Sequence, residues 1–328
     1  MSAGIRVGIV GHGNLGRGVR LALQHCPDMC LEAIFSRRDP ARLGVAPGGP
    51  AVYPLARVQE FRDALDVLIL CGGSRKDLPE QGPALARDFC TVDSFDTHAR
   101  IPEYFSQVDT AARAGGRLAL ISTGWDPGLF SVNRLLGEAI LPEGSTYTFW
   151  GKGLSQGHSD AVRRVPGVHD AVQYTIPRSA AIERVRAGET PALSTRERHT
   201  RECFVVLEQG ADAETVRDAI VSMPDYFADY DTSVHFIDAE TLARDHSAMP
   251  HGGFVIRSGQ TDAGHAQVME FSLRLQSNPE FTSSVLVAYA RAVVRLYQKG
   301  ETGAITPFDV APGLLSPRSP EALRKDLL

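Results

Sequence analysis

The chain has 328 residues, with 34 basic and 39 acidic side chains that give a net charge of −5, and 43 % of its residues are apolar. This length predicts about two domains. The apolar share excludes a disordered chain, and the mild negative charge excludes a general attraction to nucleic acid. No apolar run approaches the ~18 residues of a membrane span, and the first residues lack the basic lead and apolar core of a secretory leader.

Cysteine usage points to the cytoplasm and away from a structural metal. The five cysteines are an odd number in a long chain, whereas small secreted domains carry dense, even sets. Cys26 and Cys30 are close in sequence, but no second Cys/His pair follows at the spacing of a zinc site. We therefore expect a cytoplasmic protein with no metal ion and no disulfide framework.

The first third of the chain alternates short apolar runs with helical patterns. The run at residues 66–71 is almost wholly apolar, as expected of a parallel strand covered on both faces. Further strand-like runs lie at residues 5–10, 30–35, 89–92 and 117–122. Helical patterns lie at residues 15–25 and 83–88, and another ends at residues 110–114. This alternation predicts an α/β fold with a doubly wound parallel sheet, that is, a dinucleotide-binding domain over residues 1–125.

The pattern changes after Trp125. A series of strand-like runs has the spacing of an open, mainly antiparallel sheet, and the runs lie at residues 146–150, 171–175, 203–207, 233–237 and 268–275. We interpret residues from about 126 to 279 as a second, α+β domain. A strong helical pattern at residues 281–297 follows. We expect this helix to return to the first domain, which then comprises residues 1–125 and about 280–328.

A glycine-rich motif lies between the first predicted strand and the first predicted helix. Its six residues follow the pattern G-x-G-x-x-G and are Gly11, His12, Gly13, Asn14, Leu15 and Gly16. In this context the glycines allow a tight turn, a close backbone approach to a pyrophosphate and helix–strand packing. The N-terminus of the helix attracts the phosphates. The alternative is a glycine-rich turn with no ligand.

The end of the second predicted strand indicates which dinucleotide binds. About 20 residues after the last glycine, an NAD-binding fold carries an acidic residue for the ribose 2′-hydroxyl. Here the sequence reads Ser36, Arg37 and Arg38. A hydroxyl and two guanidinium groups suit a 2′-phosphate, so we expect NADP(H) rather than NAD(H). The alternative is a pair of exposed arginines with no ligand.

Three more loops follow predicted strands, and ligands of open α/β sheets bind beyond the carboxyl ends of the strands. Small residues in these loops leave room for a cofactor, and two aspartates place carboxylates near its nicotinamide ring. The loops consist of Cys71, Gly72, Gly73 and Ser74; of Ser94, Phe95 and Asp96; and of Thr123, Gly124, Trp125, Asp126 and Pro127.

A different motif, G-x-S-x-G at residues 153–157, matches the nucleophile elbow of serine hydrolases. Ser155 is followed by His158 and Asp160. However, a catalytic triad is normally assembled by the fold from residues far apart in sequence. The segment AVRRVPGV that follows is a poor helix, and no HGGG-type motif precedes the serine. Serine hydrolysis therefore stays a lesser alternative.

Longer stretches of the chain resemble one known family, the NADP-dependent meso-diaminopimelate dehydrogenases. The resemblance is carried by IRVGIVGHGNLGR, IFSRR, CTVDSFDTH, ISTGWDPGLFSVNR, FWGKGLSQGHSDAVRRVPGV, MPDYF, MPHGG and SNPEFTSS, which span nearly the whole chain. It implies a Rossmann-type domain built from both chain ends, joined to a dimerisation and substrate-binding region, and hence a homodimer. His12 is a departure, because the family often has an aromatic residue there.

The resemblance also implies a reaction of lysine biosynthesis. The D-centre of meso-2,6-diaminopimelate is reversibly deaminated with NADP⁺ to L-2-amino-6-oxopimelate and ammonia. Asp96 and Asp126 would hold the reacting ammonium, with Asp126 favoured over water as the proton acceptor. Arg201 and Thr175 would bind the distal carboxylate. The implied substrate contacts are Asp96, Asp126, Trp150, Gln156, Gly157, Thr175, Arg201, His251 and Asn278.

Other functions stay open at the level of the residues. Without the resemblance, Trp150 would be a core residue, His251 a turn residue and Arg201 a surface arginine. Because a fold does not determine function, a non-catalytic NADP-binding sensor is the main alternative to an enzyme. The pair of Asp96 and Asp126 favours an enzyme with an amine substrate.

Overall fold

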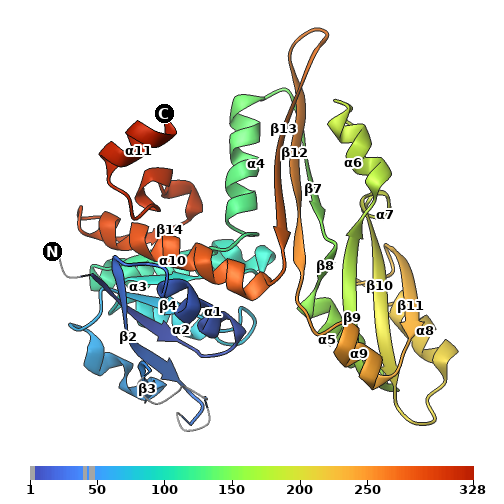
Figure 1. Cartoon of the computed structure of the whole chain (residues 1–328), viewed down its shortest axis with the longest axis horizontal. Helices are drawn as coiled ribbons and strands as arrows, with labels where there is room; N and C mark the ends of the chain where they lie inside the picture. Colours follow the sequence, from blue (N-terminus) through green and yellow to red (C-terminus); the bar gives the residue numbers. More distant parts are fainter. Residues whose placement is uncertain (1–3, 40–42, 44–48) are drawn as a thin grey trace. The chain divides into compact units, whose positions relative to one another are not determined.

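The computed structural model describes residues 4–39, 43 and 49–328. Contacts within the chain divide it into two units. Unit 1 comprises Met1–Val132 and Pro279–Leu328, and unit 2 comprises Asn133–Asn278. Figure 1 shows the elements of both units in the colours of the sequence. Within the described residues, no helix is long and apolar enough to cross a membrane.

Unit 1 is built on a parallel sheet, which confirms the predicted α/β class. In the described part of the chain this sheet has seven strands in the order β14-β6-β5-β4-β1-β2-β3. Apart from β14, this is the 3-2-1-4-5-6 order of dinucleotide-binding folds. The strands are β1 (Ile5–Val10), β2 (Met29–Ser36), β3 (Ala51–Pro54), β4 (Val67–Leu70), β5 (Thr91–Asp93), β6 (Leu118–Leu120) and β14 (Gly303–Ile305).

Helices cover both faces of this sheet, as a doubly wound fold requires. Buried side chains of α1 (Asn14–Leu23) and α10 (Asn278–Tyr297) pack on one face. Those of α2 (Leu78–Ala86) and α3 (Ile101–Gly115) pack on the other. The short final helix α11 (Pro320–Leu327) follows one-turn 3-10 helices near Pro307 and Pro312. Helix α10 confirms the helix predicted at 281–297 and begins three residues before it.

The C-terminal segment is held to the start of unit 1 by close packing and one ion pair. The Ser283 hydroxyl lies 2.6 Å from the Pro279 carbonyl of its own helix and 2.9 Å from the Leu15 carbonyl of α1, and a Cβ added to Gly18 would lie 2.4 Å from that hydroxyl oxygen. Arg291, almost fully buried on α10, donates to both carboxylate oxygens of Asp28 at 2.6 and 2.9 Å. Its remaining nitrogen donates to the Leu315 carbonyl at 2.8 Å. One guanidinium thus joins α10, the turn before β2 and the tail.

Unit 2 holds two sheets rather than the one open sheet that the sequence suggested, although both are mainly antiparallel. The orders are β11-β10-β9-β8 and β13-β12-β7, and only the β10–β11 pair is parallel. In Figure 1 the long strands β7, β12 and β13 run side by side. The strands are β7 (Gly144–Trp150), β8 (Gly153–Leu154), β9 (Val168–Pro177), β10 (His199–Leu207), β11 (Asp231–Phe236), β12 (His251–Asp262) and β13 (His265–Leu275).

Each sheet of unit 2 has its own apolar core. Helices α5 (Gln156–Arg163) and α8 (Ala213–Val221) place Val162, Val216 and Ile220 against buried residues of β9 and β10. Helix α6 (Ser179–Arg186) packs on Tyr147, Phe149 and Ile256 of the three-stranded sheet. The remaining helices are α4 (Leu129–Ile140), which spans the boundary of the units, α7 (Thr195–Arg198) and α9 (Ala239–Asp245).

Replacing Arg291 by methionine should destabilise the protein by roughly 2–3 kcal/mol. This is below the ~3–5 kcal/mol of a fully buried pair, because Asp28 keeps partial access to water. Urea unfolding measures the loss. Arg113→Met, at an exposed ion pair with Asp109, is the matched control and should cost under about 1 kcal/mol. Equal losses in the two variants would show that the Asp28 pair does not hold the C-terminal segment.

Candidate cofactor and substrate sites

The glycine-rich loop has the backbone geometry that the motif predicts. Gly11 has a φ of +94°, and a Cβ there would lie 3.2 Å from the Cys71 carbonyl oxygen. A Cβ on Gly16 would lie 2.0 Å from the Gly11 carbonyl oxygen, so α1 approaches β1 this closely only because Gly16 has no side chain. In contrast, a Cβ on Gly13 would meet open space. The loop therefore has no room for side chains at Gly11 and Gly16, which pack on the protein, and leaves space for a ligand beside Gly13.

This loop fits the pyrophosphate of a dinucleotide. Gly13 is the N-cap of α1 and has no side chain to bind the first N–H groups of the helix, and the first turn carries no acidic residue. A helix N-terminus of this kind presents N–H donors and a positive dipole end to an anion. His12 is buried, with neither ring nitrogen hydrogen-bonded. Burial and then the charges of Arg20, Arg17 and Arg38 lower its pKa, so it stays neutral at pH 7.

Ser36, Arg37 and Arg38 lie at the carboxyl end of β2, beside the phosphate loop. The Ser36 hydroxyl accepts the backbone N–H of Arg38 at 3.0 Å, and the Arg38 guanidinium donates to the His12 carbonyl at 2.5 Å. Arg37, largely exposed, pairs at 2.5 Å with Asp77, which also accepts the N–H of Gly73. The two guanidinium groups thus reach the neighbouring loops at the carboxyl end of β2.

The other predicted loops follow β4, β5 and β6, neighbouring strands of one parallel sheet. The hydroxyl of Ser74 accepts the backbone N–H of Asp96 at 3.1 Å, which ties the first loop to the second. The Asp96 side chain is exposed and that of Asp126 is partly buried, whereas Trp125 is buried edge-on against Phe130. Unit 1 therefore carries both candidate carboxylates at the same edge as the phosphate loop.

In unit 2, Trp150 is placed by a histidine that the sequence analysis did not single out. Its backbone N–H donates to Nε2 of His199 at 2.8 Å, and the two rings stack with centroids 5.5 Å apart. His199 is 3 % exposed, and burial together with the charges of Arg201 and Arg198 lowers its pKa to about 4. The neutral imidazole accepts through Nε2, so its proton lies on Nδ1. His199 could have been found from the alternation of β10, since residues two apart share a face.

Arg201 and Thr175, the pair that the resemblance implies as the binding site of the distal carboxylate, lie side by side in unit 2. They are direct partners in the pairing of β10 with β9, and the guanidinium donates to the Thr175 hydroxyl. The guanidinium also stacks over the Tyr230 ring at 3.9 Å. Arg201 is 6 % exposed, its Nε is buried with no partner, and burial lowers its pKa. A buried guanidinium of this kind is a receptor for a carboxylate.

Strand pairings and hydrogen bonds connect the other predicted substrate residues of unit 2 to neighbouring segments. Gly153 pairs with Thr175, and a Cβ on Gly153 would lie 2.5 Å from the His251 ring. Trp150 pairs with Gly253, two residues after His251. The Gln156 amide donates to the Met249 sulfur at 3.2 Å, and the backbone N–H of Asn278 donates to the Met249 carbonyl at 3.0 Å. Gly157, beside Gln156, leaves open space where a Cβ would lie.

The serine of the G-x-S-x-G motif is paired with a histidine but lacks the setting of a hydrolase. Helix α5 covers residues 156–163 and ends after the first three residues of AVRRVPGV (161–168), so most of that segment is not helical, as the sequence predicted. The Ser155 hydroxyl lies 2.7 Å from Nδ1 of His158, and it also caps α5. Burial, together with the positive charge of Arg201, lowers the pKa of His158 to about 4. A serine triad needs a carboxylate that holds the histidine, and the nearby Asp160 pairs with Arg163 instead.

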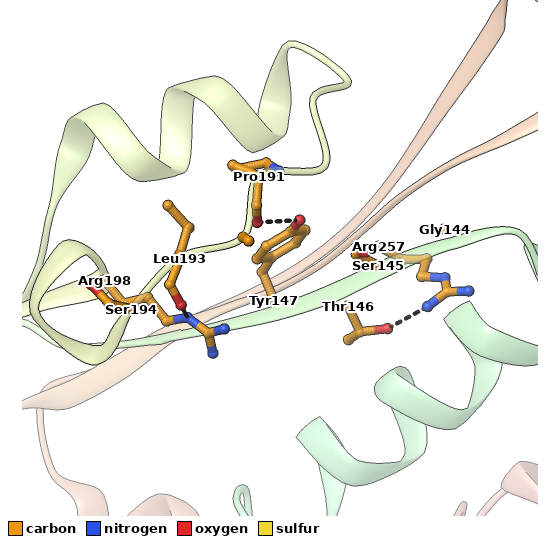
Figure 2. Close-up of a pocket in the computed structure, with 10 residues that line it drawn as sticks. Gly144, Ser145, Thr146, Tyr147, Pro191, Leu193, Ser194, Arg198 and Arg257 are labelled. Atoms are coloured by element: carbon orange, nitrogen blue, oxygen red, sulfur yellow. Dashed lines mark hydrogen bonds between the residues drawn. The ribbon is translucent and has the colours of Figure 1, made fainter.

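A pocket of about 570 Å³ lies elsewhere in unit 2, between the start of β7 and the segment 191–194 (Figure 2). Its polar groups already have protein partners. The Tyr147 hydroxyl donates to the Pro191 carbonyl, and Arg257 donates to Thr146 and to the Leu141 carbonyl. None of the predicted site residues lines it, so we do not assign the function to this pocket.

Comparison with known proteins places the whole chain in one family. The family model of the diaminopimelic acid dehydrogenase C-terminal domain matches residues 124–277. The meso-diaminopimelate D-dehydrogenase of Ureibacillus thermosphaericus is 64 % identical over 99 % of both chains. That of Lysinibacillus sphaericus is 62 % identical over the full length of both. The chain belongs to the meso-diaminopimelate D-dehydrogenase family. Its Rossmann-type fold is thus confirmed independently of the glycine motif.

Solved structures of meso-diaminopimelate D-dehydrogenases superpose along the same length. A mutant of the Clostridium tetani enzyme with DAP has a TM-score of 0.94 at 54 % identity, and the Corynebacterium glutamicum enzyme in complex with DAP has 0.92 at 47 %. An engineered D-amino acid dehydrogenase bound to NADP⁺ has 0.86 at 46 %. Each match covers 99 % of this chain and all of the other.

The neutral state of His199 predicts a pH dependence of stability. Its pKa is about 4 in the folded protein and about 6.5 when unfolded. The unfolded chain therefore binds more protons between these values, so His199 makes the free energy of unfolding rise with pH from about 4 to 6.5. His199→Gln keeps an acceptor for the Trp150 N–H but does not titrate, and should show a smaller rise. Urea unfolding at several pH values measures it.

The matched control is His265→Gln, at an exposed histidine of the β12–β13 hairpin. This variant should keep the slope of the unmodified protein. The interpretation of His199 is wrong if His199→Gln and His265→Gln give the same slope.

Proposed function

We propose that this member of the family catalyses the reversible, NADP⁺-dependent oxidative deamination of the D-centre of meso-2,6-diaminopimelate. The products are L-2-amino-6-oxopimelate and ammonia, a step of lysine biosynthesis. The observation that carries the proposal is the buried guanidinium of Arg201, bonded to Thr175 and with a free Nε. Such a group needs an anion, and the distal carboxylate of this substrate supplies one.

The Clostridium tetani mutant supports the choice of residues in unit 2. It is substituted at a glutamine, a threonine, an arginine, a proline, a histidine and an asparagine. In this chain the same residue types occur in the same order and at the same spacing, at Gln156, Thr175, Arg201, Pro250, His251 and Asn278. Five of these six are the substrate contacts that the sequence suggested. Pro250 is a further candidate, which the sequence analysis missed.

We assign separate tasks to the predicted substrate contacts. Asp96 and Asp126 of unit 1 hold the ammonium of the D-end, and Asp126 accepts the proton that the ammonium must lose before hydride can leave its carbon. In unit 2, Arg201 and Thr175 bind the carboxylate of the L-end, which His251 and Asn278 complete. Trp150, held by His199, and Gln156 wall the reacting end. As the C–H bond breaks, the nitrogen lone pair forms a C=N bond, and water then releases ammonia.

The residues at the edge of the parallel sheet would hold NADP⁺. The loop Gly11–Gly16 takes the pyrophosphate, and Ser36, Arg37 and Arg38 take the 2′-phosphate. The loops after β4, β5 and β6 border the nicotinamide end. When bound, the nicotinamide ring accepts the hydride, and the protein supplies its orientation and surroundings.

An assay of the unmodified protein tests the proposal directly. With NADP⁺ and meso-diaminopimelate at alkaline pH, absorbance of reduced nicotinamide should rise, and ammonia should form in equal amount. NAD⁺ should support far less turnover. Binding of NADP⁺ without turnover would instead indicate a sensor, and labelling by a fluorophosphonate would revive the hydrolase.

Arg201→Met should lower kcat/KM for meso-diaminopimelate at least about tenfold. The reason is the loss of a charge-assisted hydrogen bond worth about 1.5–3 kcal/mol, and the loss should fall mainly on KM. Steady-state kinetics measure it. Arg184→Met, at an exposed arginine of α6 paired with Glu189, is the control and should leave the kinetics unchanged. An Arg201→Met enzyme with unaltered KM would remove Arg201 from the substrate site.

We also propose that the protein is a homodimer and acts in the cytoplasm. The dimer is implied by the family resemblance and supported by Leu135, Leu136 and Ile140 of α4, which are 46 %, 46 % and 59 % exposed. A cluster of exposed apolar side chains indicates a surface that another chain covers. The cytoplasmic site is supported by five free cysteines, which persist in a reducing compartment.

Sedimentation velocity should therefore give the mass of two chains. Charges introduced by Leu136→Glu with Ile140→Glu should shift it to one chain, because the apolar surface would no longer be buried. Phe308→Glu, at an exposed phenylalanine of unit 1, is the control and should stay dimeric. A dimer that survives the α4 substitutions would place the interface elsewhere.

A further inference from the structure

We propose that Asp93, a residue outside the predicted substrate and cofactor contacts, is a positioning residue that holds the two loops carrying Asp96 and Asp126. The inference rests on the proposed function, because it assigns these loops a task in the reaction. Asp93 is the last residue of β5 and is 1 % exposed. It therefore acts on the reaction only through the segments that it binds.

The Asp93 side chain binds both loops at once. Its Oδ1 accepts the backbone N–H of Phe95 at 2.9 Å and that of Ser122 at 3.1 Å. Phe95 directly precedes Asp96, and Ser122 directly precedes the loop 123–127. The backbone carbonyl of Asp93 also accepts the N–H of Thr123 at 2.9 Å. One residue thus sets the distance between the turns that follow β5 and β6.

The backbone at Ser122 is the second observation. Its φ is +56°, a left-handed conformation that residues other than glycine adopt at a cost. Such a conformation persists only where its surroundings determine it, and it gathers at functional sites. Ser122 is buried and its hydroxyl has no partner, so its side chain does not stabilise the turn. The bonds from the N–H groups of Ser122 and Thr123 to Asp93 do.

The carboxylate is itself held from α3. Its Oδ2 accepts the Tyr104 hydroxyl at 2.6 Å, and the Tyr104 ring stacks on Phe95 with centroids 4.1 Å apart. A Cβ on Gly82 of α2 would lie 2.0 Å from the Tyr104 oxygen, so the hydroxyl has no room to move toward α2. The phenol, the carboxylate and the two turns form one chain of contacts inside unit 1.

The three hydrogen bonds to Asp93 require a carboxylate, because a neutral amide could not accept all of them. Three donors converge on two oxygens, and an asparagine would offer one oxygen acceptor and present N–H groups to the remaining donors. Burial raises the pKa of Asp93 to about 6 even though all three hydrogen bonds favour the ionised form. The protein keeps a buried charge here although desolvation opposes it, and its bonds go to the two turns beside the candidate carboxylates.

The experiment compares Asp93→Asn with a matched variant at the opposite edge of the sheet. Asp66 precedes β4 and accepts the backbone N–H of Arg6 at 2.8 Å, together with the Arg6 guanidinium. Asp66→Asn removes the same charge from the same sheet, but at the amino ends of its strands. It should lower stability and leave the loops beyond the carboxyl ends unchanged.

The first readout does not need turnover. The chain has two tryptophans, Trp125 in the second loop and Trp150. In a Trp150→Phe background, fluorescence reports Trp125 alone. Asp93→Asn should red-shift its emission and increase its quenching by acrylamide, because the loop loosens around a buried ring. Asp66→Asn should leave both unchanged.

The second readout is kinetic, with Trp150 restored. Asp93→Asn should lower kcat roughly ten- to hundredfold, as a misplaced catalytic group does, with a smaller change in KM. Asp66→Asn should keep both constants. Unchanged fluorescence and unchanged kcat in folded Asp93→Asn would overturn the proposal. If the unmodified protein shows no turnover but Asp93→Asn still changes the Trp125 fluorescence, Asp93 remains the anchor of the loops and the proposed function is wrong.

If Asp93→Asn does not fold, Tyr104→Phe replaces it. This variant removes one of the three hydrogen bonds and keeps the stacked ring, so it should change Trp125 quenching and kcat in the same direction by a smaller factor. Values equal to those of the unmodified protein would also overturn the proposal.

Discussion

The parallel pairing of neighbouring strands in unit 1 is the constraint on which the candidate cofactor site depends. Because β1, β2, β4, β5 and β6 run in one direction, all the loops after them open at one edge of the sheet. The glycine loop, the arginine pair and the two aspartates share that edge for this reason alone. All four residues of β4 are buried, as in a parallel strand covered on both faces.

In unit 2, the register of the strand pairs determines which predicted site residues are neighbours. Arg201 opposes Thr175, Thr175 opposes Gly153, and Gly153 packs on His251. A shift of one residue in the pairing of β9 with β10 would turn the guanidinium to the other face of its sheet. The site residues of this unit are thus far apart in sequence and adjacent only through the pairing. The buried imidazole of His199 adds the support that orients Trp150.

Much of this was predictable from the residues, and the exceptions have physical causes. The parallel sheet, its glycine loop and the helix of the C-terminal segment follow from local patterns, and the structure confirms them. The division of the antiparallel strands into two sheets was missed, because alternation shows that a strand has a buried face but not which strand pairs with it. The segment 161–168, which the sequence predicted to be a poor helix, contributes only its first three residues to α5, a helix that Ser155 caps and Val162 anchors in the core.

The sequence by itself determined the dinucleotide loop, the basic pair in place of an acidic residue after β2, and the buried strands of unit 1. These depend on backbone freedom at glycine, on charge and on periodicity, which are properties of short segments. Only the tertiary structure decided that Ser155 caps α5 beside a partly buried His158, and that Asp93 joins the turns after β5 and β6. Such contacts join residues separated along the chain, and they arise from packing and register that no local pattern contains.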